Sequence, residues 1–447
     1  MPKPLFFRIL SVILMLTVPF GHVFATHFRA GEITARRLSL SSPTYEIKLT
    51  GYFDEIGGKQ AADNQNTVVF TIGAIKGTGT PFFLEAPRVS RVNIGNNTTQ
   101  NVYIATYTFT TVGAYRISVE EDARNENVLN IGPKPTNRLN FYVSTTLEIN
   151  AAFGLNRTPV LRNAPIDLAA VGQRYIHNPG AFDADGDSIA YRMYVPQQAG
   201  ANGTGINLEY NDPNLTTPPG QTEAGASPAT FSLNRVTGDL IWDAPVTKGY
   251  YNVAFVVEEW RDGVLIGQII RDMQIIVDDA RNDRPVLPPL QDICVEAGTL
   301  INQKVVATDK NGDKLTLTSA SGTYDATLIK PPLATFTVAN QGAQGSVTGT
   351  FLWQTSCDHI RMGPYGVLFK VEDGPSPTFP NPSLFRKLAD MTSFNIRVYG
   401  PKPTGLKGTA VSDPTGTAYR LNWDAYKCQI PGANTTAGVR WCILPRM

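Results

Sequence analysis

The sequence predicts an all-β fold made of tandem β-sandwiches, and three observations favour it. Charged residues make up 17% of the 447 residues, below the ~25% of ordinary globular chains, whereas glycine and proline are frequent, at 39 and 32 residues. Segments that alternate between apolar and polar residues recur between turn-forming Gly, Asn and Pro residues, a pattern typical of half-buried strands. Several sequence blocks also occur twice, in the same order, between residues 156 and 373.

Alternation is clear in the first part of the chain. Residues 45–49 (YEIKL), 102–107 (VYIATY) and 115–119 (YRISV) place apolar and polar side chains in turn. Since successive side chains of a strand point to opposite faces of a sheet, these segments predict strands with one buried face. We assign a first sandwich to residues 26–150.

An internal repeat organises the middle of the chain. Residues 156–161 (NRTPVL) return as 282–287 (NDRPVL), and residues 183–187 (DADGD) return as 309–313 (DKNGD), with the same shift of 126 positions in both cases. Two matching blocks at one spacing indicate a duplicated structural unit.

Two further blocks continue the repeat. Residues 237–242 (TGDLIW) match residues 348–353 (TGTFLW), and residues 249–259 (GYYNVAFVVEE) match residues 363–373 (GPYGVLFKVED). The order is kept while the connecting loop shortens by about a dozen residues, as expected where surface loops vary over a common core.

Each repeat has one tryptophan on its predicted core strand, Trp242 and Trp353. A buried aromatic residue anchors a sandwich, so both side chains are predicted to fill cores. The alternative is an exposed platform that stacks on sugar rings.

The repeated blocks resemble cadherin-like modules of the dystroglycan type, which have an immunoglobulin-like fold. The resemblance covers residues 156–398 and implies two modules, at 156–279 and at 282–398. Residues 26–34 (THFRAGEIT) are similar to the opening of large surface proteins of the gliding-motility-associated or adhesin type. Such proteins carry tandem immunoglobulin-like modules, so the resemblance implies a bacterial surface protein.

The last segment, residues 401–447, resembles the start of a fibronectin type III module. Residues 401–406 (PKPTGL) and 419–424 (YRLNWD) match its first strands. The segment is about half as long as a ~100-residue sandwich, and half a module cannot close a core. We expect a partial module, produced by truncation or by a frameshift.

The N-terminus has the composition of a signal peptide. Lys3 and Arg8 precede an apolar run at residues 9–20, and residues 23–25 (VFA) supply the small residues that a signal peptidase needs. The run is shorter than the ~20 residues that span a bilayer. Residues 1–25 are therefore predicted to be removed, and the protein to be secreted to the extracellular space or the cell surface without a transmembrane segment.

The charge balance argues against a nucleic-acid partner. Lys plus Arg number 39 and Asp plus Glu number 38, a net charge of +1. No basic surface or acidic tail is indicated. The expected partner is an extracellular glycan or another surface protein.

Two acidic turns are candidates for a calcium site. Their oxygen-bearing side chains stand at alternate positions around a glycine, namely Asp183, Asp185 and Asp187 in one repeat and Asp309, Asn311 and Asp313 in the other. Calcium prefers six to eight oxygen ligands, which such a turn helps to supply. The alternative is that the Asp-Gly and Asn-Gly pairs make hairpin turns and bind no ion.

More acids stand near these turns in the sequence and can complete a site: Glu258, Glu259, Glu372, Asp373, Asp278, Asp279 and Asp283. The linker at residues 278–285 (DDARNDRP) resembles the acidic linkers through which cadherin-type modules bind calcium. The resemblance implies a cation at the junction that stiffens a rod of repeats. The first linker, residues 150–159, lacks these acids.

The cysteines Cys294, Cys357, Cys428 and Cys442 all lie in the C-terminal third. Export places them where disulfides persist, and three pairings are open for four cysteines. We favour Cys294 with Cys357, because these two bracket one repeat. No CxxC pair occurs, so the sequence does not indicate a zinc site.

Signals for catalysis are weak. His27, His177 and His359 are the histidines beyond the signal peptide, and no HExxH, GxSxG or P-loop pattern occurs. Glu258 and Glu259 are neighbours on one strand, so they cannot flank one glycosidic bond together. We therefore expect no enzymatic activity, and an adhesive or structural surface protein. A non-catalytic, carbohydrate-binding accessory region of a secreted polysaccharide-degrading enzyme is the alternative.

Overall fold

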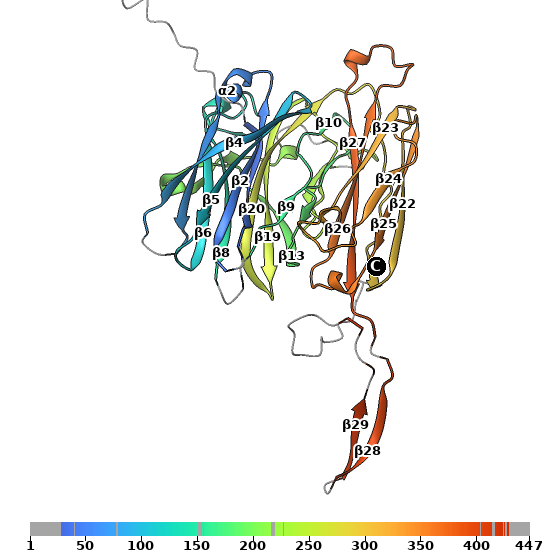
Figure 1. The fold of residues 1–447 in the computed structure, drawn as a ribbon. Helices are drawn as coiled ribbons and strands as arrows, with labels where there is room; N and C mark the ends of the chain where they lie inside the picture. The colour runs from blue at the N-terminus through green and yellow to red at the C-terminus, as the bar shows by residue number, and fades with distance from the viewer. Residues whose placement is uncertain are drawn as a thin grey trace, which may run out of the picture.

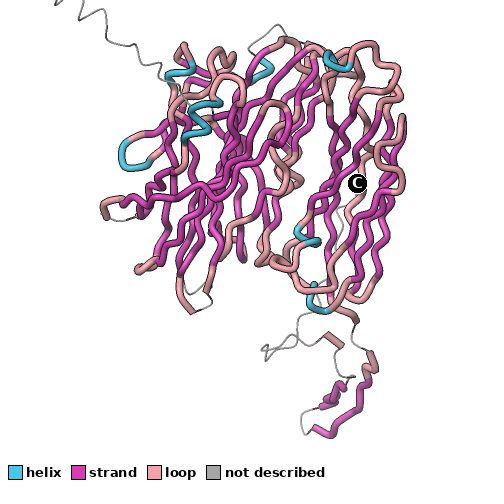
Figure 2. Tube along the Cα trace, turned by 45° about the horizontal axis from the view of Figure 1, so that its top comes forward, coloured by secondary structure: helices cyan, strands magenta, loops and turns pink. Residues whose placement is uncertain are grey.

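The structure is a computed structural model that describes residues 28–39, 41–76, 79–150, 154, 156–215, 220–226, 228–402, 404–413, 416–422, 424 and 427–428. Strands dominate these residues, with one short α-helix, α2 (Lys59–Asn64), and a few 3-10 turns (Figure 2). The predicted all-β class is confirmed. The predicted signal peptide lies outside the described residues, and within them no helix is long and apolar enough to cross a membrane.

Eight strands form the N-terminal part: β1 (Phe28–Arg37), β2 (Thr44–Asp54), β3 (Thr67–Ala74), β4 (Phe82–Gly95), β5 (Thr98–Thr108), β6 (Gly113–Glu121), β7 (Ile131–Gly132) and β8 (Phe141–Ile149). In β2 the alternation read from the sequence places Tyr45, Ile47 and Leu49 in the core, while Glu46 and Lys48 between them stay half-exposed. Burial of one apolar face of each strand stabilises this N-terminal part.

The first repeat contains β9 (Val160–Leu161), β10 (Leu168–Ala170), β11 (Tyr175–His177), β12 (Ala181–Phe182), β13 (Ser188–Tyr194), β14 (Gln197–Ala199), β15 (Gly205–Asn207), β16 (Glu209–Tyr210), β17 (Thr230–Leu233), β18 (Leu240–Asp243), β19 (Gly249–Arg261) and β20 (Val264–Asp278). The second repeat contains β21 (Ile293–Glu296), β22 (Leu300–Thr308), β23 (Lys314–Ala320), β24 (Thr335–Val338), β25 (Ser346–Gln354), β26 (Tyr365–Gly374) and β27 (Ala389–Tyr399).

Both repeats have the same strand order. In the second repeat one sheet runs β21-β27-β26-β23, with β21 parallel to β27, and the other runs β22-β25-β24. In the first repeat β10 lies parallel to β20, followed by β19 and β13, and the second sheet runs β11-β18-β17. Two sheets paired in this way form an immunoglobulin-like sandwich. The repeat found in the sequence is therefore a repeat of structure.

The two tryptophans are buried in the cores of their repeats, as predicted. Trp242 is 1% exposed and packs edge-on against Tyr251, with ring centroids 4.8 Å apart. Trp353 is fully buried and meets Tyr365 in the same way at 4.9 Å. Neither indole is available to stack on a sugar.

Strand β20 joins the N-terminal sandwich to the first repeat. It pairs with β19 along its length, with β10 on its other side near its end, and with β1 and β8 of the N-terminal part. The pairings β20-β1-β2-β5-β4-β3-β6-β8-β20 close a circuit. The N-terminal sandwich therefore has no free edge at β1 or β8 where it meets β20.

Buried ion pairs reinforce this junction. Arg124 donates to both carboxylate oxygens of Asp272 on β20, at 3.0 and 2.7 Å, and both side chains are shielded from solvent. The neighbouring Arg271 pairs with Glu32 of β1 at 2.8 Å. Glu32 belongs to the segment THFRAGEIT, so part of that distinctive sequence serves to join two sandwiches.

The two repeats lie side by side, which differs from the expected rod (Figure 1). Gly363, just before β26, donates its N–H to Gly186 O at 2.9 Å. Gly186 belongs to the acidic turn before β13, and this turn lies beside the end of β19 because Ser188 pairs with Trp260. At the opposite end, Asp278 at the end of β20 accepts from Arg386 Nε at 2.6 Å. Because β19 and β20 are antiparallel, β26 runs opposite to β19, and the two sandwiches pack antiparallel. Contacts between β11 and β27 extend along the same interface.

Two strands, β28 (Lys407–Asp413) and β29 (Gly416–Asn422), follow the second repeat as a hairpin that extends away from the sandwiches (Figure 1). Strand β29 overlaps the predicted strand at residues 419–424, whereas residues 401–406, also predicted to form a strand, come before β28. Residues 429–447, including Cys442, lie outside the described residues.

The predicted Cys294–Cys357 disulfide is not the one that forms. Cys357 is bonded to Cys428, and Cys294 is engaged in another disulfide. Cys294 lies on β21, in the sheet with β27, whereas Cys357 lies in a 3-10 turn that follows β25 of the opposite sheet. Bracketing a repeat in sequence did not bring these two residues together, because the turn that holds Cys357 lies against the segment after the second repeat, where Cys428 reaches it.

Candidate metal centres

Three carboxylates of the second repeat meet in a buried cluster, which we call the second cluster: Asp309, Asp313 and Asp373. One oxygen from each lies within 4.8 Å of the others. Asp309 and Asp313 belong to the turn between β22 and β23, and Asp373 lies near the end of β26. The turn closes on itself, since Asp313 N donates to Asp309 Oδ1 at 2.9 Å.

The second cluster is buried and short of hydrogen-bond donors. Asp309, Asp313 and Asp373 are 8%, 1% and 1% exposed, respectively. Asp313 Oδ1 accepts from Ser376 N at 3.0 Å, and Asp373 Oδ1 accepts from Leu388 N at 2.7 Å. Asp309 Oδ2 and Asp313 Oδ2 are buried without a hydrogen-bond partner among the described residues. No ion pair between described residues involves any of the three carboxylates.

Asn282 completes the wall of the second cluster. Its Nδ2 donates to Asp373 Oδ2 at 2.7 Å and to Arg386 O at 3.1 Å, and the residue is 4% exposed. With Nδ2 committed to two acceptors, Oδ1 is left buried and without a partner. Four residues thus hold three unsatisfied oxygens, each of which costs free energy unless a donor or a cation reaches it.

Electrostatics at the second cluster favour protonation or a cation. Burial raises the pKa of the Asp373 carboxyl to about 8, and the Asp309 and Asp313 charges act in the same direction. Burial also raises the pKa of Asp309, with the charge of Asp313 adding to the effect. Like charges in a buried site disfavour ionisation, whereas a bound cation reverses that effect.

The first repeat contains the same arrangement, which we call the first cluster: Asp183, Asp187 and Glu259. Asp187 N donates to Asp183 Oδ1 at 2.7 Å, as in the other turn. Asn156 Nδ2 donates to Glu259 Oε2 at 2.8 Å and so takes the place of Asn282. Burial raises the pKa of Asp183 to about 6, with the charges of Asp187 and Asp185 adding to the shift. Burial also raises the pKa of Glu259 well above its usual range, with the charges of Asp183 and Asp187 adding to that shift.

Arg261 distinguishes the first cluster from the second. Its Nε donates to Asp187 Oδ1 at 2.8 Å, and its NH2 group donates to Asp187 Oδ2 at 2.5 Å and to Asn156 Oδ1 at 2.8 Å. The equivalents of the last two acceptors are Asp313 Oδ2 and Asn282 Oδ1, which have no partner. One guanidinium therefore satisfies the equivalents of two of the three oxygens that the second cluster leaves open, while Asp183 Oδ2 and Glu259 Oε1 of the first cluster stay buried without a partner among the described residues.

Two of the six predicted ligands lie outside the clusters. Asp185 accepts from Arg157 Nε and NH2 at 3.0 and 2.8 Å. Asn311 Oδ1 accepts from Asp283 N at 2.6 Å, which ties the turn to the linker. In each turn the middle side chain is therefore engaged by a residue outside the cluster. The outer two, Asp183 with Asp187 and Asp309 with Asp313, do come together.

The structure separates the additional acids. Glu259 and Asp373 join the clusters, whereas Glu258 pairs with Arg192 at 2.7 Å and Glu372 pairs with Lys370 at 3.3 Å. Of the linker acids, Asp278 and Asp279 pair with Lys248, and Asp283 lies 3.4 Å from Lys310. Asn156 and Asn282 were not identified from the sequence, although each is the first residue of the repeated block NRTPVL or NDRPVL.

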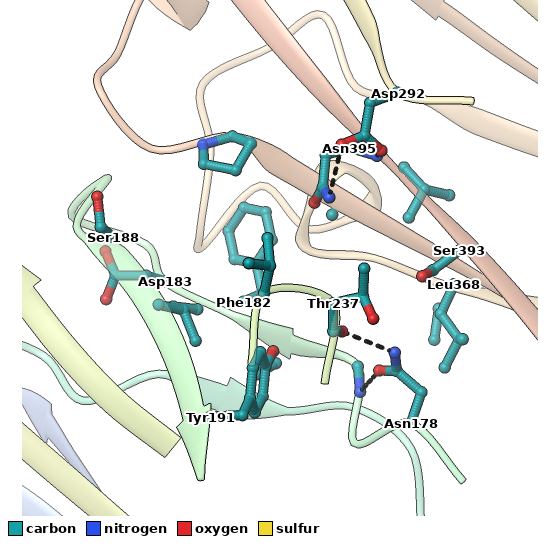
Figure 3. A pocket seen from close by; sticks show the side chains of 18 of the residues that line it. Asn178, Phe182, Asp183, Ser188, Tyr191, Thr237, Asp292, Leu368, Ser393 and Asn395 are labelled. Atoms are coloured by element: carbon teal, nitrogen blue, oxygen red, sulfur yellow. Dashed lines mark hydrogen bonds between the residues drawn. The ribbon is translucent and has the colours of Figure 1, made fainter. Parts of the chain in front are cut away.

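A cleft of about 150 Å³ separates the repeats beside the first cluster. Figure 3 shows Asp183, Ser188 and Tyr191 facing Asp292 and Asn395 across it. Its amide groups are engaged with neighbours: Asn178 donates to Thr237 O, and Asn395 donates to Asp292 Oδ2 at 3.2 Å. These contacts stabilise the walls of the cleft.

Of the candidate histidines, the two described ones are buried. His359 accepts from Ser356 N at 3.0 Å and its other ring nitrogen lies 2.8 Å from Lys330 O. His177 lies 3.5 Å from Arg271, and burial holds the pKa of both imidazoles below the usual range. His27 lies outside the described residues.

The sequence matches no protein-family model and no curated protein. Similar solved structures include human protocadherin-24 EC1-2, with 17% identity and a TM-score of 0.19 over 56% of this chain and 100% of that chain. The sialic acid binding region of a Streptococcus sanguinis SK1 adhesin has 12% identity and a TM-score of 0.19 over 80% of this chain and 76% of that chain. The titin domains Z1Z2, in a complex with telethonin, have 13% identity and a TM-score of 0.16 over 55% of this chain and 95% of that chain. Similarity at this level carries no argument about what the chain binds.

Proposed function

We propose that the chain is an exported, non-catalytic surface protein whose sandwiches form an adhesive or structural body, and that its second cluster binds calcium. The observation that carries the calcium proposal is the contrast at Arg261. The first cluster has a guanidinium at the position where the second has two unsatisfied oxygens, Asp313 Oδ2 and Asn282 Oδ1. A cation at that position supplies the missing positive charge.

The donor set selects the kind of cation. Asp309, Asp313, Asp373 and Asn282 offer oxygens alone, and the second cluster contains no histidine or cysteine. Carboxylate and amide oxygens suit hard cations such as calcium, whereas zinc and copper favour nitrogen and sulfur. Calcium accepts an irregular set of six to eight oxygens, so water completes the shell.

A calcium ion in the second cluster would join three parts of the second repeat. Asn282 belongs to the linker, Asp309 and Asp313 belong to the turn before β23, and Asp373 lies at the end of β26. The ion would fix the entry of the chain into the repeat, at the end where Arg386 contacts Asp278 of the first repeat. Its role is therefore structural, to hold these three parts of the second repeat in one arrangement.

The calcium proposal is tested by thermal unfolding of the full chain without its signal peptide, in 1 mM calcium and in chelator. A ligand at 100 times its Kd stabilises a protein by about 2.7 kcal/mol, so calcium should raise the Tm. The double variant Asp309→Ala, Asp313→Ala should lose most of that rise. Asp358→Ala, which removes an exposed carboxylate of the same repeat, should keep it. Identical melting curves for the wild type in both buffers would contradict the proposal.

The surface proposal rests on the signal peptide expected from the sequence, on the resemblance of residues 26–34 to surface proteins, and on the tandem sandwiches. It is tested by whether an antibody or an added protease reaches the protein on intact cells, and by glycan-array binding of the purified chain. Surface exposure together with binding supports an adhesive role. Retention inside the cell, or hydrolysis of polysaccharide by the purified chain, would contradict the proposal.

A further inference from the structure

The two clusters are built from carboxylates at equivalent positions of the two repeats. Superimposing the sequence blocks matches Asp183 with Asp309, Asp187 with Asp313 and Glu259 with Asp373. The position equivalent to Arg261, two residues after the acid on the central strand, is Pro375. Proline carries no charge and donates no hydrogen bond from its side chain, so the second cluster cannot be neutralised in the same way.

Arg261 is placed to exclude another cation. Its guanidinium donates to both carboxylate oxygens of Asp187 and to Asn156 Oδ1. These are oxygens that a metal ion in the first cluster would otherwise use as ligands. The bidentate geometry is among the strongest that arginine makes with a carboxylate. The hydrogen bond with Asp187 raises the pKa of Arg261, so this charge is always present.

The neighbouring arginines are engaged elsewhere. Arg157 pairs with Asp185, outside the first cluster. Arg361 from the second repeat donates to Asp183 O at 2.8 Å and stacks its guanidinium over the ring of Tyr365, 3.7 Å from the centroid. It contacts the backbone of the turn and leaves the Asp183 carboxylate to the first cluster. Among the described residues, Arg261 is therefore the cation that pairs with an acid of the first cluster, Asp187.

We propose that Arg261 is a built-in cation that closes the first cluster to calcium, so that of two equivalent clusters only the second takes an ion. The inference rests on the proposed calcium site and adds which cluster is used and what prevents the other from binding. If the inference holds, replacing Arg261 alone should convert the first cluster into a calcium site.

The test counts bound calcium per chain, by equilibrium dialysis and by isothermal titration, with the full chain without its signal peptide. We expect one ion for the wild type and two for Arg261→Gln. Arg157→Gln, a matched loss of one arginine beside the same turn, should still bind one. Adding Asp187→Asn to Arg261→Gln should return the count to one, because it removes a ligand of the new site.

Different outcomes separate this inference from the calcium proposal itself. One ion in both the wild type and Arg261→Gln would overturn the inference and leave the second cluster as the calcium site. No ion in the wild type with one in Arg261→Gln would overturn the calcium proposal for the second cluster while supporting the role of Arg261. No ion in either protein would overturn both.

A reciprocal variant keeps the test valid if Arg261→Gln does not fold. Pro375→Arg places a guanidinium at the equivalent position of the second cluster, and it should weaken calcium binding by about tenfold or more, equal to at least ~1.4 kcal/mol. Pro375→Gln, which removes the proline but adds no charge, should bind calcium as the wild type does. Equal affinities for Pro375→Arg and Pro375→Gln would contradict the proposed exclusion.

Discussion

At Asp373 a proton would compete with the proposed calcium ion for one carboxylate. The side chain accepts hydrogen bonds from Leu388 N and Asn282 Nδ2, which favour its charged form. Burial works against that form more strongly, and the charges of Asp309 and Asp313 add to burial, so the pKa rises to about 8. Without a cation, Asp373 therefore holds a proton at neutral pH. In the proposed site, calcium would have to displace this proton on binding.

The raised pKa of Asp373 predicts how stability depends on pH. The unfolded chain releases this proton near pH 4, whereas the folded chain keeps it up to about pH 8. The folded state thus binds more protons in this window, and its stability falls as the pH rises. In chelator we expect the Tm to decrease between pH 5 and 8, and Asp373→Asn to show a smaller decrease.

The same residue sets the pH dependence of calcium binding. The rise in Tm that calcium produces should be larger at pH 8 than at pH 5.5 in the wild type, because fewer protons compete for Asp373. Glu259→Gln serves as the control, since it removes a raised carboxyl pKa from the first cluster only. If the wild type and Asp373→Asn show the same pH profile in chelator, Asp373 does not titrate in this window.

At the scale of elements, the loop before β26 sets how the two repeats dock. Gly363 lies against the backbone of the acidic turn, and an added Cβ would come within 2.6 Å of Asp187 O and 2.7 Å of Gly186 O. These are backbone atoms that cannot rotate away. Arg361, two residues earlier, fixes the same turn through Asp183 O. Close packing of one loop against one turn therefore requires a glycine at this position.

Gly363→Ala should loosen this contact. Overpacking of a tight site costs about 1–3 kcal/mol, so we expect a lower Tm. We also expect faster hydrogen exchange at residues 183–187, where the turn loses its support. Gly79→Ala is the control, since an added Cβ meets no atom within 4 Å there, and it should change neither readout. Unchanged exchange in Gly363→Ala would show that the repeats do not depend on this contact.

The elements show what the sequence could and could not predict. The repeated blocks predicted equivalent strands and buried tryptophans, because both follow from local pattern. They also predicted three ligands in each turn, of which only the outer two come together. The roles of Arg261 and of Asn282 depend on where side chains meet after folding. The side to which Asp185 points depends on turn geometry. The pairing of Cys357 with Cys428 depends on where a segment beyond the second repeat lies. None of these has a signal in spacing alone.

At the scale of the whole molecule, the sandwiches form one body because a strand and individual side chains of one sandwich also pair or pack with the next. Strand β20 pairs with strands of both the N-terminal part and the first repeat. Phe182 of the first repeat packs into the hydrophobic core of the second. Lys370 of the second repeat forms a shielded ion pair with Asp167 of the first, at 2.5 Å. Elements that contribute to two cores couple the stability of those cores, so hinge motion between the sandwiches is opposed.

This coupling predicts a compact particle whose dimensions do not depend on calcium. A compact body of about 370 residues has a radius of gyration of about 21 Å, and the C-terminal segment would add modestly to that value. A rod of repeats hinged at acidic linkers would instead be much longer, and it would stiffen when calcium binds. Small-angle X-ray scattering of the full chain in calcium and in chelator distinguishes the two arrangements. We expect superimposable curves, because β20, Phe182 and the Lys370–Asp167 pair hold the sandwiches together without an ion. An increase in the maximum dimension on adding calcium would show that the sandwiches separate in solution and that the side-by-side packing of the repeats is not maintained.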